Sequence, residues 1–259
     1  MTVVVDGAGV EIPGVLTRSF LDDPSLHLAK EDCAARPKMR VRSIVLHTTQ
    51  VLWPQVVWPG SGKAGGAAAN LHYWAGDHKC ASSHLLVDPD GVVFCAADLA
   101  REQTWHATSI NPVSIGIEIV QRSDGALFRA QLDAIVAVVD WLTRRFRIQR
   151  QIPDVYRGAI PRLIAGGHDF VGVCGHRDQS NNRGRGDPGD AVFDAFAAAG
   201  YERFNVLAGD DRQAWRDRQH ALGFTGDDVD GIALDDTCNA LERAGHCGGL
   251  WIERPGDRA

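Results

Sequence analysis

The segment "GHRDQSNNRGRGDPGD" (175–190) carries two side chains that bind metal ions well, His176 and Asp187, eleven positions apart on one turn-rich stretch. A third candidate, His47, closes the apolar run "VRSIVLH". Two imidazoles and one carboxylate suit catalytic zinc, because three protein ligands leave the fourth tetrahedral position open for water. Zinc lowers the pKa of that water from about 15.7 to about 7. The chain has ten histidines, and a single histidine at a strand end is more often structural, so residue types alone leave both interpretations open.

The elements that must position these residues are predicted from hydrophobic patterning. Residues 41–49 ("VRSIVLHTT") and 170–176 ("FVGVCGH") predict buried strands that end near the two histidines. "VSIGIEIV" (113–120) alternates as a strand does and contains Glu118. "SSHLLVDPDGVVFCAAD" (82–98) predicts a β-hairpin, because Asp-Pro-Asp-Gly is a strong turn signal between apolar runs.

Residues 126–147 predict an amphipathic helix. Ser123 or Asp124 is the expected N-cap, and basic residues occupy the last turns. The apolar positions expected to face the core are Leu132, Ile135, Val136, Val139, Leu142 and Phe146. Strands interleaved with helices indicate an α/β fold, a mixed central β-sheet flanked by helices, with the chemistry at the strand ends.

Composition limits the function classes. The 259 residues carry a net charge of −6, which argues against nucleic acid as a partner. No apolar run approaches the roughly 20 residues of a membrane helix, so no membrane insertion is expected. The N-terminal sequence lacks the features of a classical signal peptide. We therefore expect a soluble, monomeric protein made in the cytoplasm.

The six cysteines contain no Cys-x-x-Cys pair of the kind that structural zinc sites use. Free, largely buried thiols are the expectation, although the even number permits pairing, and Cys238 with Cys247 is the first pair to test.

Six segments occur in the order and at about the separations seen in one enzyme family. They are "IVLHTT", "SSHLLVDPDGVVF", "TWHA", "SIGIEIV", the helix that begins near Phe128, and "GHRD…GRGDPGDAVF". By the order and spacing of these segments, roughly residues 40–200 resemble the zinc-dependent N-acetylmuramoyl-L-alanine amidases. These enzymes belong to the superfamily of type-2 amidases and peptidoglycan recognition proteins. Each segment is a weak signal alone, but their ordered combination is specific.

The resemblance implies one zinc ion per chain, held by His47, His176 and Asp187. His168 also follows Gly and precedes Asp, but only His176 leads directly to Asp-Pro-Gly. Glu118 is then the general base of an amide hydrolysis that separates N-acetylmuramic acid from L-alanine in peptidoglycan. Arg185 stands where the family usually has a lysine facing the scissile carbonyl, and the loop from His176 looks one residue longer than is common in the family.

The resemblance also places His106, His84 and Trp105 near the site but outside the metal ligands, as substrate-binding or supporting residues. For His106, contact with substrate and a structural role are equally open, whereas a structural or supporting role is favoured for His84.

The chain is expected to divide into three parts. Residues 1–40 form an N-terminal extension packed on the catalytic domain, residues 41–204 the zinc amidase domain, and residues 205–259 a small helical domain. The last part resembles peptidoglycan-binding domains, but "VDGIALDDT" lacks their Gly-Pro, so a packing appendage is the alternative.

Three functions are compatible with these sequence features. The favoured one is a cell-wall amidase acting as an endolysin or delivered effector, outside the cytoplasm, with cytoplasmic muropeptide recycling as a variant. A metal-free recognition module of the same fold is the second, although such relatives usually lack a ligand. An unrelated α/β hydrolase is the third, but no Gly-x-Ser-x-Gly occurs.

Overall fold

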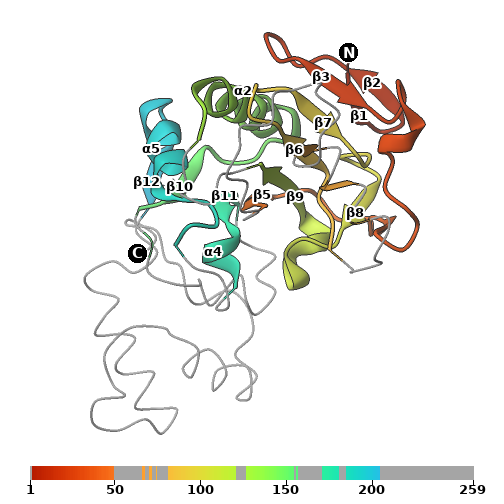
Figure 1. Ribbon diagram of the computed structural model, residues 1–259. Coiled ribbons are helices and arrows are strands. Elements are labelled where there is room, and N and C mark those ends of the chain that lie inside the picture. The colour runs from red at the N-terminus through yellow and green to blue at the C-terminus, as the bar shows by residue number, and fades with distance from the viewer. Residues whose placement is uncertain are drawn as a thin grey trace, which may run out of the picture.

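A six-stranded mixed sheet forms the centre of the protein in the computed structural model (Figure 1). The structure describes residues 2–49, 66–67, 70–71, 74, 81–120, 127–154, 156, 171–180 and 185–204. The strand order is β11-β5-β9-β6-β7-β3. The strands are β3 (Thr17–Ser19), β5 (Ser43–Thr48), β6 (Leu85–Val87), β7 (Val93–Cys95), β9 (Ser114–Ile119) and β11 (Gly172–Gly175).

The first four strands in this order run parallel, and β7 turns back antiparallel to β6 to close the predicted hairpin. Strand β3 then pairs parallel to β7 at the sheet edge. The predicted mixed α/β sheet is confirmed. The strands predicted within 41–49, 113–120 and 170–176 are confirmed as β5, β9 and β11.

Alternation along the strands gives the sheet two different faces. Ile44, Leu46, Ile115 and Ile117 are fully buried in the main hydrophobic cluster with residues of two helices. These helices are α2 (Arg129–Phe146) and α5 (Asp190–Ala198), whereas α4 (His176–Gln179) lies on the opposite side of the sheet from α2 in Figure 1. Because side chains alternate along a strand, the intervening residues of β5 and β9 point to the other face.

Helix α2 confirms the predicted amphipathic pattern. Ile135, Val139 and Leu142 are fully buried, and the other three predicted positions pack partly buried against the same cluster. The predicted cap is wrong: the helix begins at Arg129, with Phe128 at the N-cap and no side-chain cap bond. Ser123 and Asp124 lie outside the described residues.

Short elements complete the fold. Two-stranded pairs form from β1 (Val3–Val5) with β2 (Ala8–Val10), β4 (Cys33–Ala35) with β8 (Glu102–Thr104), and β10 (Gln151–Pro153) with β12 (Glu202–Phe204). The 3-10 helices are η1 (Pro24–Leu26) and η2 (Thr108–Val113). The N-terminal segment thus supplies β3 to the main sheet and three buried valines of β1 to its core.

The described residues bear on the expectations about the cysteines and about a membrane helix. Cys33, Cys95 and Cys174 are free and buried as expected, whereas Cys80, Cys238, Cys247 and His168 lie outside the described residues, as does the whole of 205–259. Among the described helices, none combines the length and apolarity needed to cross a membrane.

Candidate metal centre

His47 and His176 are brought together by the pairing of β5 with β11. The two strands are parallel, and Gly175 is the register partner of Leu46. The next residue of each chain segment is therefore a histidine at the same edge of the sheet. Their ring centroids lie 4.5 Å apart.

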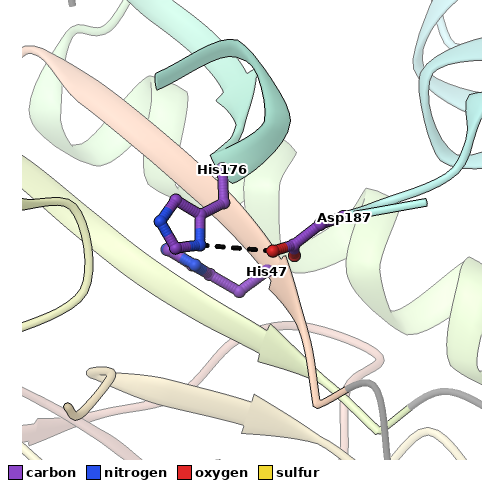
Figure 2. A group of neighbouring side chains, drawn as sticks. All are labelled: His47, His176 and Asp187. Carbon is purple, nitrogen blue, oxygen red and sulfur yellow. Dashed lines mark ion pairs between the residues drawn. The ribbon is translucent and has the colours of Figure 1, made fainter. Parts of the chain in front are cut away.

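Asp187 completes the group from the loop before α5 (Figure 2). Its Oδ2 lies 3.2 Å from Nδ1 of His176, and its Oδ1 accepts the backbone N–H of Thr48 at 2.8 Å. One ligand atom from each of His47, His176 and Asp187 lies within 4.8 Å of the others. The structure therefore brings together all three sequence-predicted ligands, close enough to hold one metal ion.

The electrostatics of this group favour a bound cation. Burial raises the pKa of the Asp187 carboxyl, but the hydrogen bond from His176 and the nearby His47 outweigh burial, so the net shift of the pKa is downward. Asp187 is therefore an anion in a site where it is only 2% exposed. The side chain of His176 is 13% exposed, so the group is reachable from one side.

Glu118 lies beside this group on the neighbouring strand. It is the register partner of His47 across the parallel pair β5–β9, and residues paired in this way project to the same face about 4.8 Å apart. It is partly buried, in contrast to the fully buried residues around it on β9. Its role as general base remains a prediction.

Arg185 makes a contact that the sequence interpretation did not include. Its Nε donates to Oδ2 of Asp190 at 2.8 Å, at the start of α5, and its side chain is 70% exposed. Arg177 joins the same carboxylate through Nη1 at 2.6 Å and also donates to the Arg185 carbonyl. The predicted position of Arg185 opposite a scissile carbonyl is not tested by this arrangement.

His106 lies between β8 and η2, and its side chain contacts that of His47. Its Nδ1 is 3.1 Å from Nε2 of His47, and its Nε2 is 3.0 Å from Oγ of Ser114. Burial, followed by the neighbouring His84 and Arg36, holds the pKa of His106 well below the usual value for histidine. His106 is thus neutral and adjoins the ligand group, as the resemblance implies.

His84 lies one step further from the ligands. It is fully buried, its Nδ1 accepts the N–H of Gly116 at 3.0 Å, and its Nε2 is 2.8 Å from Nη2 of Arg36. Burial is the main reason that the pKa of His84 is lowered, and Arg36 adds to it. In the described residues His84 therefore contacts the framework and not the ligand group.

Trp105 is anchored to the N-terminal segment. Its ring Nε1 donates to the carbonyl of Glu31 at 2.8 Å, and its backbone N–H donates to Oγ of Ser82 at 2.9 Å. The indole is partly exposed, so its predicted contact with substrate stays a prediction.

Sequence reasoning missed three supporting residues. Thr48 acts through its backbone N–H, which no side-chain pattern reveals. Gly116 and Ser114 share the site face of β9, and a glycine inside a strand often marks a close approach of another group. The glycine of "VSIGIEIV" is such a signal.

Comparisons with known proteins agree with the resemblance. Residues 37–190, more than half of the chain, match the family described as N-acetylmuramoyl-L-alanine amidase. No curated protein matches the chain.

Several solved structures are similar. The N-acetylmuramoyl-L-alanine amidase LysC from Clostridium intestinale is 12% identical, with 73% of this chain and 99% of that chain covered and a TM-score of 0.43. A mutant endolysin from Bacillus subtilis is 20% identical, covering 71% and 97%, with a TM-score of 0.45. The Ph2119 endolysin from a Thermus scotoductus bacteriophage is 14% identical, covering 72% and 98%, with a TM-score of 0.46. On the family match, the chain belongs to the N-acetylmuramoyl-L-alanine amidase family.

Proposed function

We propose that this protein is a zinc-dependent N-acetylmuramoyl-L-alanine amidase that hydrolyses the amide between N-acetylmuramic acid and L-alanine in peptidoglycan. The observation that carries the proposal is the convergence of His47, His176 and Asp187 within 4.8 Å. Family membership supplies the reaction class.

The donor set fits zinc better than magnesium or calcium. Two imidazole nitrogens and one carboxylate oxygen are typical ligands of Zn²⁺, whereas Mg²⁺ and Ca²⁺ prefer oxygen ligands throughout. Three protein ligands leave one position for a water molecule or a substrate oxygen. When bound, zinc would supply a Lewis acid that polarises the scissile carbonyl and makes water a better nucleophile at neutral pH.

The chain's own residues would do the remaining work. The Thr48 N–H holds the Asp187 carboxylate in place through one oxygen and leaves the other facing His176. We assign to the Glu118 carboxylate the proton removed from the attacking water, which it then returns to the departing L-alanine nitrogen. We assign to Arg185 the stabilisation of negative charge on the carbonyl oxygen, which would require its guanidinium to exchange Asp190 for the substrate.

The same proposal includes the place of action. We propose that the enzyme acts on the cell wall as an endolysin or delivered effector, with residues 205–259 as a wall-binding part. Cytoplasmic recycling of soluble muropeptides is the alternative, and it requires no affinity for intact wall.

The test combines metal content with product analysis on the full-length protein. Elemental analysis should find one zinc per chain, and incubation with purified sacculi should release new L-alanine amino groups. Asp187→Ala should lose both zinc and amine release. Asp133→Ala, an exposed change on α2, is the matched control and should keep both.

Two outcomes contradict the proposal in different ways. Amine release that persists in Asp187→Ala after chelation would contradict the zinc assignment. Tight binding of sacculi without amine release by the zinc-loaded protein would instead indicate a recognition module.

A further inference from the structure

Three side chains form a hydrogen-bonded row beneath the candidate metal centre. Oγ of Ser114 lies 3.0 Å from Nε2 of His106, and Nδ1 of His106 lies 3.1 Å from Nε2 of His47. We infer that His106 is a positioning residue that fixes the tautomer of His47, so that His47 presents Nδ1 to the metal. This inference rests on the proposed zinc site and specifies which atom of its first ligand is used.

Ser114, at the end of the row away from His47, determines which atom donates in each hydrogen bond. The Ser114 hydroxyl donates its hydrogen to the carbonyl of Ile110 at 2.7 Å. Toward His106 the same oxygen is then an acceptor, so the ring hydrogen of His106 must be on Nε2. The His106 ring is buried between a neutral hydroxyl and another imidazole, surroundings that disfavour a charged ring, so it carries one N–H and its Nδ1 accepts.

The acceptor role of His106 determines which ring nitrogen of His47 carries the hydrogen. If Nδ1 of His106 accepts, Nε2 of His47 must donate, and the hydrogen of the His47 ring is on Nε2. The lone pair of His47 is then on Nδ1, and this is the ring atom that would bind a metal ion. Ligating histidines commonly donate their other ring N–H to a partner that fixes the ring in this way.

Gly116 of strand β9 leaves the space that the His106 ring occupies. A Cβ atom on Gly116 would lie 2.6 Å from Cγ of His106 and 2.8 Å from Oγ of Ser83, so a side chain there would displace the ring. On the same face of β9, Ser114 precedes this gap and Glu118 follows it.

The backbone of His106 is held independently of its ring. Oδ1 of Asn111 accepts the N–H groups of His106 at 3.2 Å and of Ala107 at 2.6 Å. His106 is only 7% exposed, and both of its ring nitrogens make hydrogen bonds. It is therefore in a position to orient His47 and not to exchange protons with a substrate.

The first experiment reads the tautomers directly. Long-range proton–nitrogen NMR on the full-length protein with ¹⁵N-labelled histidine should show His47 and His106 in the Nε2–H form. The measurement is made on chelator-treated protein and repeated with zinc added. A His47 ring that carries its hydrogen on Nδ1 in the chelator-treated protein would overturn the inference, whether or not the protein binds zinc.

The second experiment measures zinc affinity by competition with a chromophoric chelator. Ser114→Ala removes the acceptor that sets the row, and zinc affinity should fall by about 10-fold, the lower end of the range for supporting partners of metal ligands. Ser83→Ala removes another fully buried serine hydroxyl beside Gly116 and should leave affinity unchanged.

Substitution of His106 provides the conservative comparison. The side-chain oxygen of Asn can stand near the position of ring Nδ1 and accept from His47, so His106→Asn should bind zinc about 10-fold more tightly than His106→Leu. Equal affinities in these two variants, or in the two serine variants, would contradict the positioning role. If the wild-type protein binds no zinc at all, the proposed function fails instead, and the tautomer measurement still decides the arrangement of the row.

Discussion

Asp98 should be one of the main attachments of the N-terminal segment to the catalytic domain. Its carboxylate is 5% exposed and accepts four backbone N–H groups. Two come from the turn between β1 and β2, Asp6 at 3.0 Å and Gly7 at 2.6 Å. Two are local, Ala100 at 2.8 Å and Arg101 at 3.0 Å. Asp98→Ala removes all four acceptors at once.

The expected loss can be worked out from these contacts. Hydrogen bonds to a charged group contribute about 1.5–3 kcal/mol each, but Asp6 and Gly7 are exposed and water can replace part of the loss. We therefore expect the free energy of unfolding to fall by about 3 kcal/mol, which lowers the melting temperature by about 6–12 °C for a domain of this size.

The assay is urea and thermal unfolding of Asp98→Ala beside Asp133→Ala. Within the described residues, Asp133 makes an exposed ion pair with Arg129 on α2, and such pairs contribute little because water and salt screen them. Unfolding of Asp98→Ala at the wild-type temperature would refute the reasoning, because it would mean that the four hydrogen bonds to Asp98 contribute nothing to the stability of the domain.

Three further changes test the site, the pH dependence and the C-terminal part. Glu118→Gln should keep zinc and the fold while amidase activity falls by about 10²–10⁴-fold, and a near wild-type rate would place the base elsewhere. Burial raises the pKa of Asp88 to about 6, so the stability that its neutral form provides is present below about pH 4 and lost as the pH rises to 6. Asp88→Asn should accordingly raise the free energy of unfolding by about 1–3 kcal/mol at pH 7 and by almost nothing at pH 4, measured by urea unfolding, and an equal effect at both pH values would contradict the pKa shift. Truncation after residue 204 should leave hydrolysis of small soluble muropeptides nearly unchanged and slow the digestion of insoluble sacculi, whereas equal losses on both substrates with a lower melting temperature would indicate a packing role.

The sequence predicted the elements that carry a clear hydrophobic period. β5, β9, the β6–β7 hairpin and α2 all alternate or repeat over enough residues for the buried side to be identified. The three candidate ligands, which the structure brings within 4.8 Å of one another, were singled out only by the ordered segments of the resemblance, and their binding of a metal stays a prediction. The residue types alone had left a structural role equally open.

The elements that were missed are short or depend on distant partners. β3 has three residues, too few to show a period, and it joins the main sheet only because β7 offers a free edge. The start of α2 was misplaced because a tertiary contact overrides the local capping signal. The Gln131 side chain, fully buried, donates to the carbonyls of Val87 and Val120 and fixes the first turn against the sheet.

The two-faced alternation of β5 has a consequence for how the protein can vary. Ile44 and Leu46 face the hydrophobic cluster, whereas Ser43, Val45 and His47 alternate with them and face the other side of the sheet. Deleting one residue before His47 within 43–48 would exchange the faces, placing the imidazole against α2 and the side chain of Thr48 where His47 now lies. Homologous chains should therefore differ here by substitution and never by a single-residue insertion or deletion, since one such change would remove catalysis and folding stability together.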